Sequence, residues 1–72
     1  MENYMEKLAE MLEWCLNAMK RYPGKENFGL RNNFYHQAFG AASFVELATL
    51  TDEATNLWQS KEEELNKALW ET

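Results

Sequence analysis

The chain has 72 residues, of which 46% are hydrophobic and 14% aromatic, with a single cysteine and a formal net charge of −5. This balance predicts one globular domain over residues 1–72 and excludes a disordered chain. The single cysteine excludes an internal disulfide and any metal site built from several cysteines, and the acidic charge argues against a general nucleic-acid binder.

The first predicted helix covers residues 2–22. Its apolar positions recur at spacings of three and four residues: Met5, Leu8, Leu12, Cys15, Met19 and Tyr22. This period is that of an amphipathic helix, and the apolar arc is wide enough to contact two neighbouring helices. Pro23 and Gly24 then end the helix. Cys15 belongs to the arc, so we expect it to be a small buried hydrophobe rather than a reactive thiol.

Trp14 lies on the polar side of this first helix. Exposed tryptophans are enriched at interfaces, so Trp14 is a candidate contact for a partner. The alternative is that its ring packs over the stems of Lys7 or Arg21 on the same helix, or against a nearby loop.

The second predicted helix covers residues 30–48 and has very few charges. From Asn32 through Thr51 the only charged residue is Glu46. The main apolar positions are Leu30, Phe34, Ala38, Ala41, Val45 and Ala48, with Tyr35, Phe39, Ala42 and Phe44 beside them. A helix this apolar is normally central and covered on most sides by other helices.

Another side of this helix is uncharged and mostly small or polar. We call it the uncharged stripe, and it consists of Asn33, His36, Gly40, Ser43 and Leu47. Glycine inside a helix costs roughly 1 kcal/mol relative to alanine, so Gly40 suggests a compensating role, such as close approach of two helix backbones. The hypothesis is homodimerisation through this stripe about a two-fold axis. The alternative is a solvent-facing stripe that happens to lack charge.

The third predicted helix covers residues 52–70, with Thr49 or Thr51 as its cap and acidic residues in its first turn. Its apolar face consists of Ala54, Leu57, Trp58, Leu65, Ala68 and Leu69. Lys61 falls within this face. Either its stem packs while its ammonium reaches water, or it pairs with an acidic residue on another helix.

No glycine or proline separates the second and third segments. A single helix over residues 30–70, which would form a long helical hairpin, is therefore an alternative. We favour a break near residues 49–52, because three segments of similar length pack side by side. The predicted fold class is all-α, a three-helix bundle that assembles into a larger helical bundle as a homodimer.

Residues 20–31 combine cations with aromatic side chains. The cations are Lys20, Arg21, Lys25 and Arg31. Such a segment can hold phosphates, stack bases or bind an acidic protein partner. The competing interpretation is that two cations stabilise the end of the first helix and the others solubilise a loop. Four cations on an acidic chain are too few for a typical nucleic-acid footprint.

The sequence offers no convincing catalytic group. His36 is the only histidine, and no acidic residue stands at a helical spacing that would orient it. We therefore expect no enzyme activity, no cofactor and no metal site. A histidine within the uncharged stripe could instead make dimerisation depend on pH.

The function predicted from these patterns is interaction rather than catalysis, as an adaptor, accessory or regulatory protein. One alternative is a small nucleic-acid-associated protein that uses residues 20–31. Another is an anionic decoy that competes with nucleic acid through the glutamates of the first and third helices. The start of the chain lacks the features of a signal peptide, and no apolar run reaches the ~18 residues of a membrane span, so we expect a cytoplasmic protein without a membrane segment.

Overall fold

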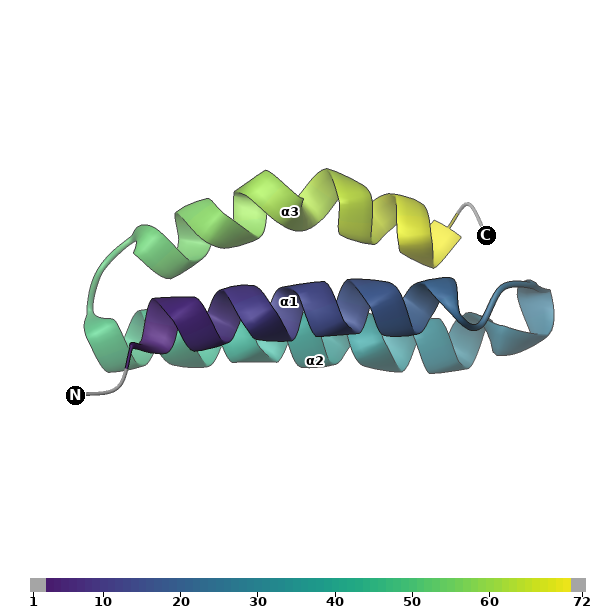
Figure 1. The fold of residues 1–72 in the computed structure, drawn as a ribbon, viewed down its shortest axis with the longest axis horizontal. Coiled ribbons are helices and arrows are strands. Elements are labelled where there is room, and N and C mark those ends of the chain that lie inside the picture. The colour runs from purple at the N-terminus through teal and green to yellow at the C-terminus, as the bar shows by residue number, and fades with distance from the viewer. Residues whose placement is uncertain (1–2, 71–72) are drawn as a thin grey trace.

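The computed structural model describes residues 3–70 and contains only helices and their connections within that range (Figure 1). The elements are α1 (Tyr4–Lys20), a short 3-10 helix η1 (Lys25–Asn27), α2 (Phe28–Thr49) and α3 (Glu53–Trp70). The predicted all-α fold with three helices is confirmed, as is the break near residues 49–52. The alternative of one helix over residues 30–70 is wrong. Each observed end lies within two residues of its prediction, and residue 2 falls outside the described part.

The three helices pack lengthwise into an elongated bundle with principal extents of 40 × 19 × 14 Å. Consecutive helices run in opposite directions, so α1 begins beside the α2–α3 turn and α3 ends beside the α1–α2 loop (Figure 1). The core lies between the helices, and its largest fully buried side chains are Leu8, Leu12, Leu16, Met19, Leu65 and Cys15. No helix within residues 3–70 has the length and hydropathy needed to cross a membrane.

Local signals define the limits of α1. The side chain of Asn3 caps the helix, because its Oδ1 accepts a hydrogen bond from the Glu6 amide at 3.0 Å. After the last turn, Gly24 has a φ of 96°, which side chains with a Cβ rarely adopt. The Asn27 side-chain amide donates to the Pro23 carbonyl at 2.9 Å and holds the loop closed. The chain therefore reverses within a few residues and enters α2.

Arg31 joins three segments at this end of the bundle. It is only 3% exposed. Its Nε donates to the carbonyl of Leu69 at 3.1 Å, and its Nη1 donates to the carbonyls of Tyr22 at 2.8 Å and Gly24 at 2.7 Å. Carbonyls at helix ends lack partners within the helix and bear partial negative charge. The guanidinium therefore fastens the C-terminal end of α3 and the α1–α2 loop onto α2.

Lys61 forms another polar link between helices. Its ammonium lies 3.3 Å from the carboxylate of Glu13, so α3 is paired with α1. Of the two arrangements predicted for Lys61, the structure has the pairing with an acid on another helix. Both side chains are partly exposed, and ion pairs of this kind contribute about 0–1 kcal/mol.

A left-handed residue separates α2 from α3. Leu50 has φ 56° and ψ 35°, and its amide donates to the Glu46 carbonyl at 2.9 Å. This is the hydrogen bond of an αL cap, in which glycine is the usual residue. Thr49, one of the two predicted caps of α3, instead donates its hydroxyl to the Val45 carbonyl at 2.8 Å. The turn therefore places a leucine in a conformation that is costly for a side chain with a Cβ.

Leu50→Gly is expected to increase the free energy of unfolding by about 0.5–1 kcal/mol, because relief of the left-handed strain outweighs the added freedom of the unfolded chain. Urea denaturation of dilute protein, followed by circular dichroism, measures the change. Leu50→Ala is the matched control, since it removes the same exposed side chain but keeps the Cβ. Equal gains in the two variants would show that exposure of the leucine, rather than its φ, sets the cost.

Candidate functional site

The uncharged stripe lies on the side of α2 that faces away from α1 and α3. The buried residues of α2 are Arg31, Ala38, Ala42 and Val45. At 100° per residue these four positions define one side of the helix, and the stripe lies on the opposite side. Asn33, His36, Gly40 and Leu47 are exposed, and Ser43 is partly buried. The structure therefore brings the predicted stripe residues together on one open surface.

Large hydrophobic side chains accompany this stripe. Phe39 is 51% exposed, Phe44 is 64% exposed and Leu47 is 75% exposed. Sequence periodicity placed both phenylalanines beside the core positions, and it did not predict their exposure. The exposure of these two side chains depends on how much of the circumference of α2 the neighbouring helices cover. Helical spacing alone does not specify that coverage.

The open side of α2 is unusual because the least charged helix is also the least buried. Four of the 22 residues of α2 are buried, compared with six of 17 in α1 and five of 18 in α3. One of those four is Arg31. An apolar helix is expected to be covered on most sides, whereas within residues 3–70 α2 packs against α1 and α3 and, over a few residues, against η1. Exposed apolar surface of this kind is typical of protein–protein contact sites.

Gly40 lies at an open position of α2 in the part of the chain that the structure describes. A Cβ built at this position meets nothing within 4 Å. Its backbone is an ordinary part of α2 and has no positive φ that would require glycine. Within the described residues 3–70, no contact at this site compensates for the lower helix propensity of glycine.

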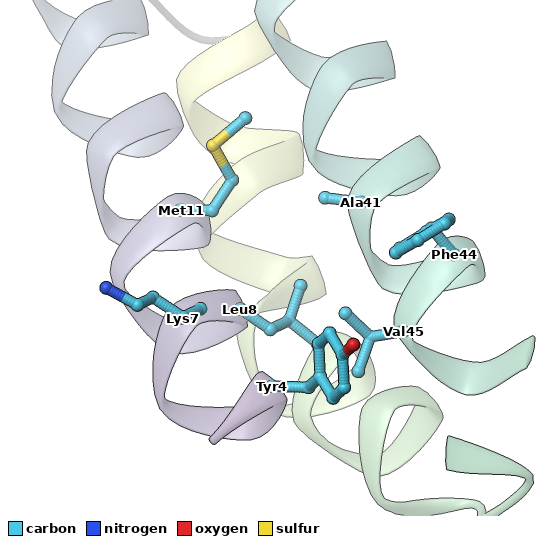
Figure 2. Close-up of a pocket in the computed structure, with 7 residues that line it drawn as sticks. All are labelled: Tyr4, Lys7, Leu8, Met11, Ala41, Phe44 and Val45. Atoms are coloured by element: carbon cyan, nitrogen blue, oxygen red, sulfur yellow. The ribbon is translucent and has the colours of Figure 1, made fainter. Parts of the chain in front are cut away.

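A groove between α1 and α2 adjoins the exposed side of α2 at Phe44 (Figure 2). Its volume is about 360 Å³. It is lined by Tyr4, Lys7, Leu8, Met11, Ala41, Phe44 and Val45. The Lys7 ammonium points away from the ring of Tyr4, so the walls between the helices are mainly apolar (Figure 2). The groove extends the exposed apolar surface from α2 toward α1.

Trp14 is half exposed and packs onto α2. Its ring meets Phe34 edge to face, with centroids 5.6 Å apart. Phe34 in turn stacks on Tyr22 at 6.2 Å. The tryptophan contacts a neighbouring helix, which differs from the predicted packing on its own helix or on a loop. The remaining half of its surface is open to solvent, so a partner could still contact it.

The four cations of residues 20–31 do not share one surface. Lys20, Arg21 and Lys25 are exposed, whereas Arg31 is buried with its donors on three backbone carbonyls. Phe28, also from this segment, packs against Trp70 with centroids 5.0 Å apart. The structure therefore leaves three cations at this end of the molecule, and Arg31 holds the fold together.

The structure places Cys15 in the core and His36 on the exposed side of α2. Cys15 is fully buried, and burial raises the pKa of its thiol, so the protonated form is favoured. The thiolate is the nucleophilic form of cysteine. His36 is exposed, and its ring meets Tyr35 at 6.1 Å. Within residues 3–70, no three histidine, cysteine, aspartate or glutamate side chains are grouped so as to hold a metal ion.

Comparison of the chain with protein-family models, with curated proteins and with solved structures finds no match. Any functional interpretation therefore depends on the surface of the chain itself.

Proposed function

We propose that this chain is a non-catalytic protein–protein interaction module that self-associates as a homodimer through α2. The observation that carries the proposal is the mismatch between composition and burial in α2. This helix has the fewest charges of the three, yet a single chain buries only one side of it. A second α2 packed on the open side would give the helix the surroundings that its composition suits.

The charge distribution supports the same surface. The exposed glutamates of the other two helices are Glu6, Glu10 and Glu13 on α1 and Glu53, Glu62, Glu63 and Glu64 on α3. Two copies that met through α1 or α3 would bring like charges together, which is unfavourable. The uncharged stripe is free of that repulsion, because it contains no aspartate, glutamate, lysine or arginine.

Gly40 is suited to the centre of this contact. Small residues let two helix backbones approach closely, and the Cβ position of Gly40 is open in the monomer. Phe44 and Leu47 follow it along the exposed side and offer apolar area to the partner. A two-fold axis near Gly40 would set each of these side chains against the partner's copy of the same surface.

Light scattering over a dilution series tests the proposal. Wild-type protein is expected near twice its 8.5 kDa chain mass. Gly40→Leu is expected to return the mass toward that of one chain, because each overpacked side chain at a close contact costs about 1–3 kcal/mol. A wild-type mass of one chain at high concentration would contradict self-association.

The stability of the Gly40→Leu variant distinguishes loss of the dimer from loss of the fold. Because the Gly40 Cβ position is open, leucine there should strengthen α2 of the monomer through its better helix propensity. Loss of dimer would then accompany unchanged or greater stability, which separates it from unfolding. Gln59→Leu adds leucine at an exposed position of α3 and should leave the dimer intact. An intact dimer in Gly40→Leu would rule out close approach at this glycine.

A further inference from the structure

A second cleft lies between α2 and α3, on the side of α2 away from α1. Its volume is about 190 Å³, and it is lined by Phe39, Ala42, Ser43, Glu46, Thr55 and Trp58. Sites for drug-sized ligands usually measure about 300–1,000 Å³, so this cleft suits a compact group. None of the lining residues is cationic, and one of them, Glu46, is an acid.

Aromatic rings form one wall of the cleft. Phe39 meets Trp58 with centroids 5.3 Å apart and the ring planes at 82°. Tyr35 packs against the same tryptophan at 5.5 Å and 76°. Ring faces bear negative electrostatic potential, and cations bind to them within about 6 Å of the centroid. Phe39 is half exposed, so part of its surface remains available to a ligand.

The carboxylate of Glu46 stands at the same cleft and is held in position. The Thr55 hydroxyl donates to its Oε2 at 2.6 Å, which leaves Oε1 available to another group. Neither of the two ion pairs within residues 3–70 involves Glu46. Tyr35 also packs against Trp58, and burial and then the charge of Glu62 raise the pKa of this tyrosine. The carboxylate of Glu46 therefore lies at the cleft, and the charge of Glu62 acts on a second ring of the same aromatic cluster.

We propose that this cleft binds a compact organic cation with a methylated ammonium group. Aromatic faces with a single carboxylate are the usual surroundings of quaternary ammonium ligands. A guanidinium group is a poorer fit, because it has five N–H donors in an arginine side chain and six in the free ion, and these need several acceptors. Methyl groups instead match the apolar part of the lining, which Phe39, Ala42 and Trp58 supply. The cleft adjoins the proposed dimer contact, because Ser43 belongs to both, but its aromatic wall and its carboxylate come from residues outside the uncharged stripe.

Tetramethylammonium chloride is the probe. Its titration into 15N-labelled protein is expected to shift the Trp58 indole and the amides of Glu46 and Thr55, and to saturate with a Kd on the order of 1–10 mM. The Trp14 indole, on the opposite side of α2, should not follow this curve. Sodium chloride at equal concentration controls for ionic strength, and guanidinium chloride at low concentration should bind more weakly. Shifts that sodium chloride reproduces would overturn the proposal.

Two variants assign the binding to the cleft. Phe39→Leu and Glu46→Gln are each expected to increase the Kd at least about fivefold, through loss of the ring face or of the charge. Phe44→Leu is the matched control, because it removes an exposed phenylalanine of the same helix outside this cleft. Tetramethylammonium should leave the mass from light scattering unchanged. Unaltered binding in both Phe39→Leu and Glu46→Gln would disprove the site.

Discussion

Arg31→Ala is expected to destabilise the fold by about 3–5 kcal/mol, because it removes a buried guanidinium and leaves three backbone carbonyls without their charged donor. The guanidinium serves the carbonyls of Tyr22, Gly24 and Leu69, which belong to the α1–α2 loop and to the end of α3. A core of this size supplies only about 3–5 kcal/mol. The variant should therefore be largely unfolded at 25 °C, as measured by circular dichroism and urea denaturation.

The geometry of the guanidinium, and not charge alone, explains this effect. Arg31→Lys keeps the charge, but a compact ammonium cannot serve carbonyls that contact different nitrogens of the fork, so a loss between wild type and alanine is expected. The difference between wild type and Arg31→Ala should persist at high salt, because buried interactions are screened little. Arg21→Ala is the exposed control at the same end of the bundle, and its cost should stay below about 1 kcal/mol. A cost that small for Arg31→Ala would mean that water can replace its hydrogen bonds.

The helices of this protein could be predicted because their signals are local. The spacing of apolar residues in α1 and the Pro23–Gly24 pair depend only on neighbouring positions. The break before α3 was also predictable, from the polar Thr51–Asp52–Glu53 sequence and from segment length. The left-handed conformation of Leu50 was not predictable, because that residue type rarely adopts it. A glycine there would have given the signal.

The role of Arg31 could not be predicted, because its partners are backbone groups. The Leu69 carbonyl is 38 residues away in the chain. Because every residue has a backbone carbonyl, the residue types do not indicate which carbonyl Arg31 contacts. A cation followed by aromatic residues is equally consistent with a surface patch. Only the approach of the α3 end to the α1–α2 loop distinguishes the two, and that approach is a property of the assembled bundle.

The uncharged stripe, in contrast, was predictable as a set of residues on one helix side. Its helical spacing placed Asn33, His36, Gly40, Ser43 and Leu47 together, as the structure does. The exposure of Phe39 and Phe44 was not predictable, because it depends on how far α1 and α3 extend around α2. The cleft between α2 and α3 depends on the same packing. Both candidate surfaces thus arise because α2 has more apolar surface than its two neighbouring helices can cover.

Two leucines provide a direct test of whether that excess surface is used. Leu65 is 0% exposed and Leu47 is 75% exposed, so the same substitution by alanine removes the same atoms from opposite surroundings. Leu65→Ala is expected to cost about 2–5 kcal/mol and to lower the thermal midpoint at every protein concentration. For a domain of this size each kcal/mol corresponds to about 4–8 °C.

Leu47→Ala is expected to act through association instead. A dimer that forms only from folded chains stabilises them by mass action, so the wild-type Tm should rise with concentration over a roughly hundredfold series. At the lowest concentration Leu47→Ala should match wild type within about 0.5 kcal/mol, since an exposed side chain contributes little to the monomer. As concentration rises, its Tm should increase less than that of wild type. If its Tm fell equally at all concentrations, as for Leu65→Ala, Leu47 would belong to the monomer core. A wild-type Tm independent of concentration would contradict self-association, and any partner of the open side of α2 would then be a different protein.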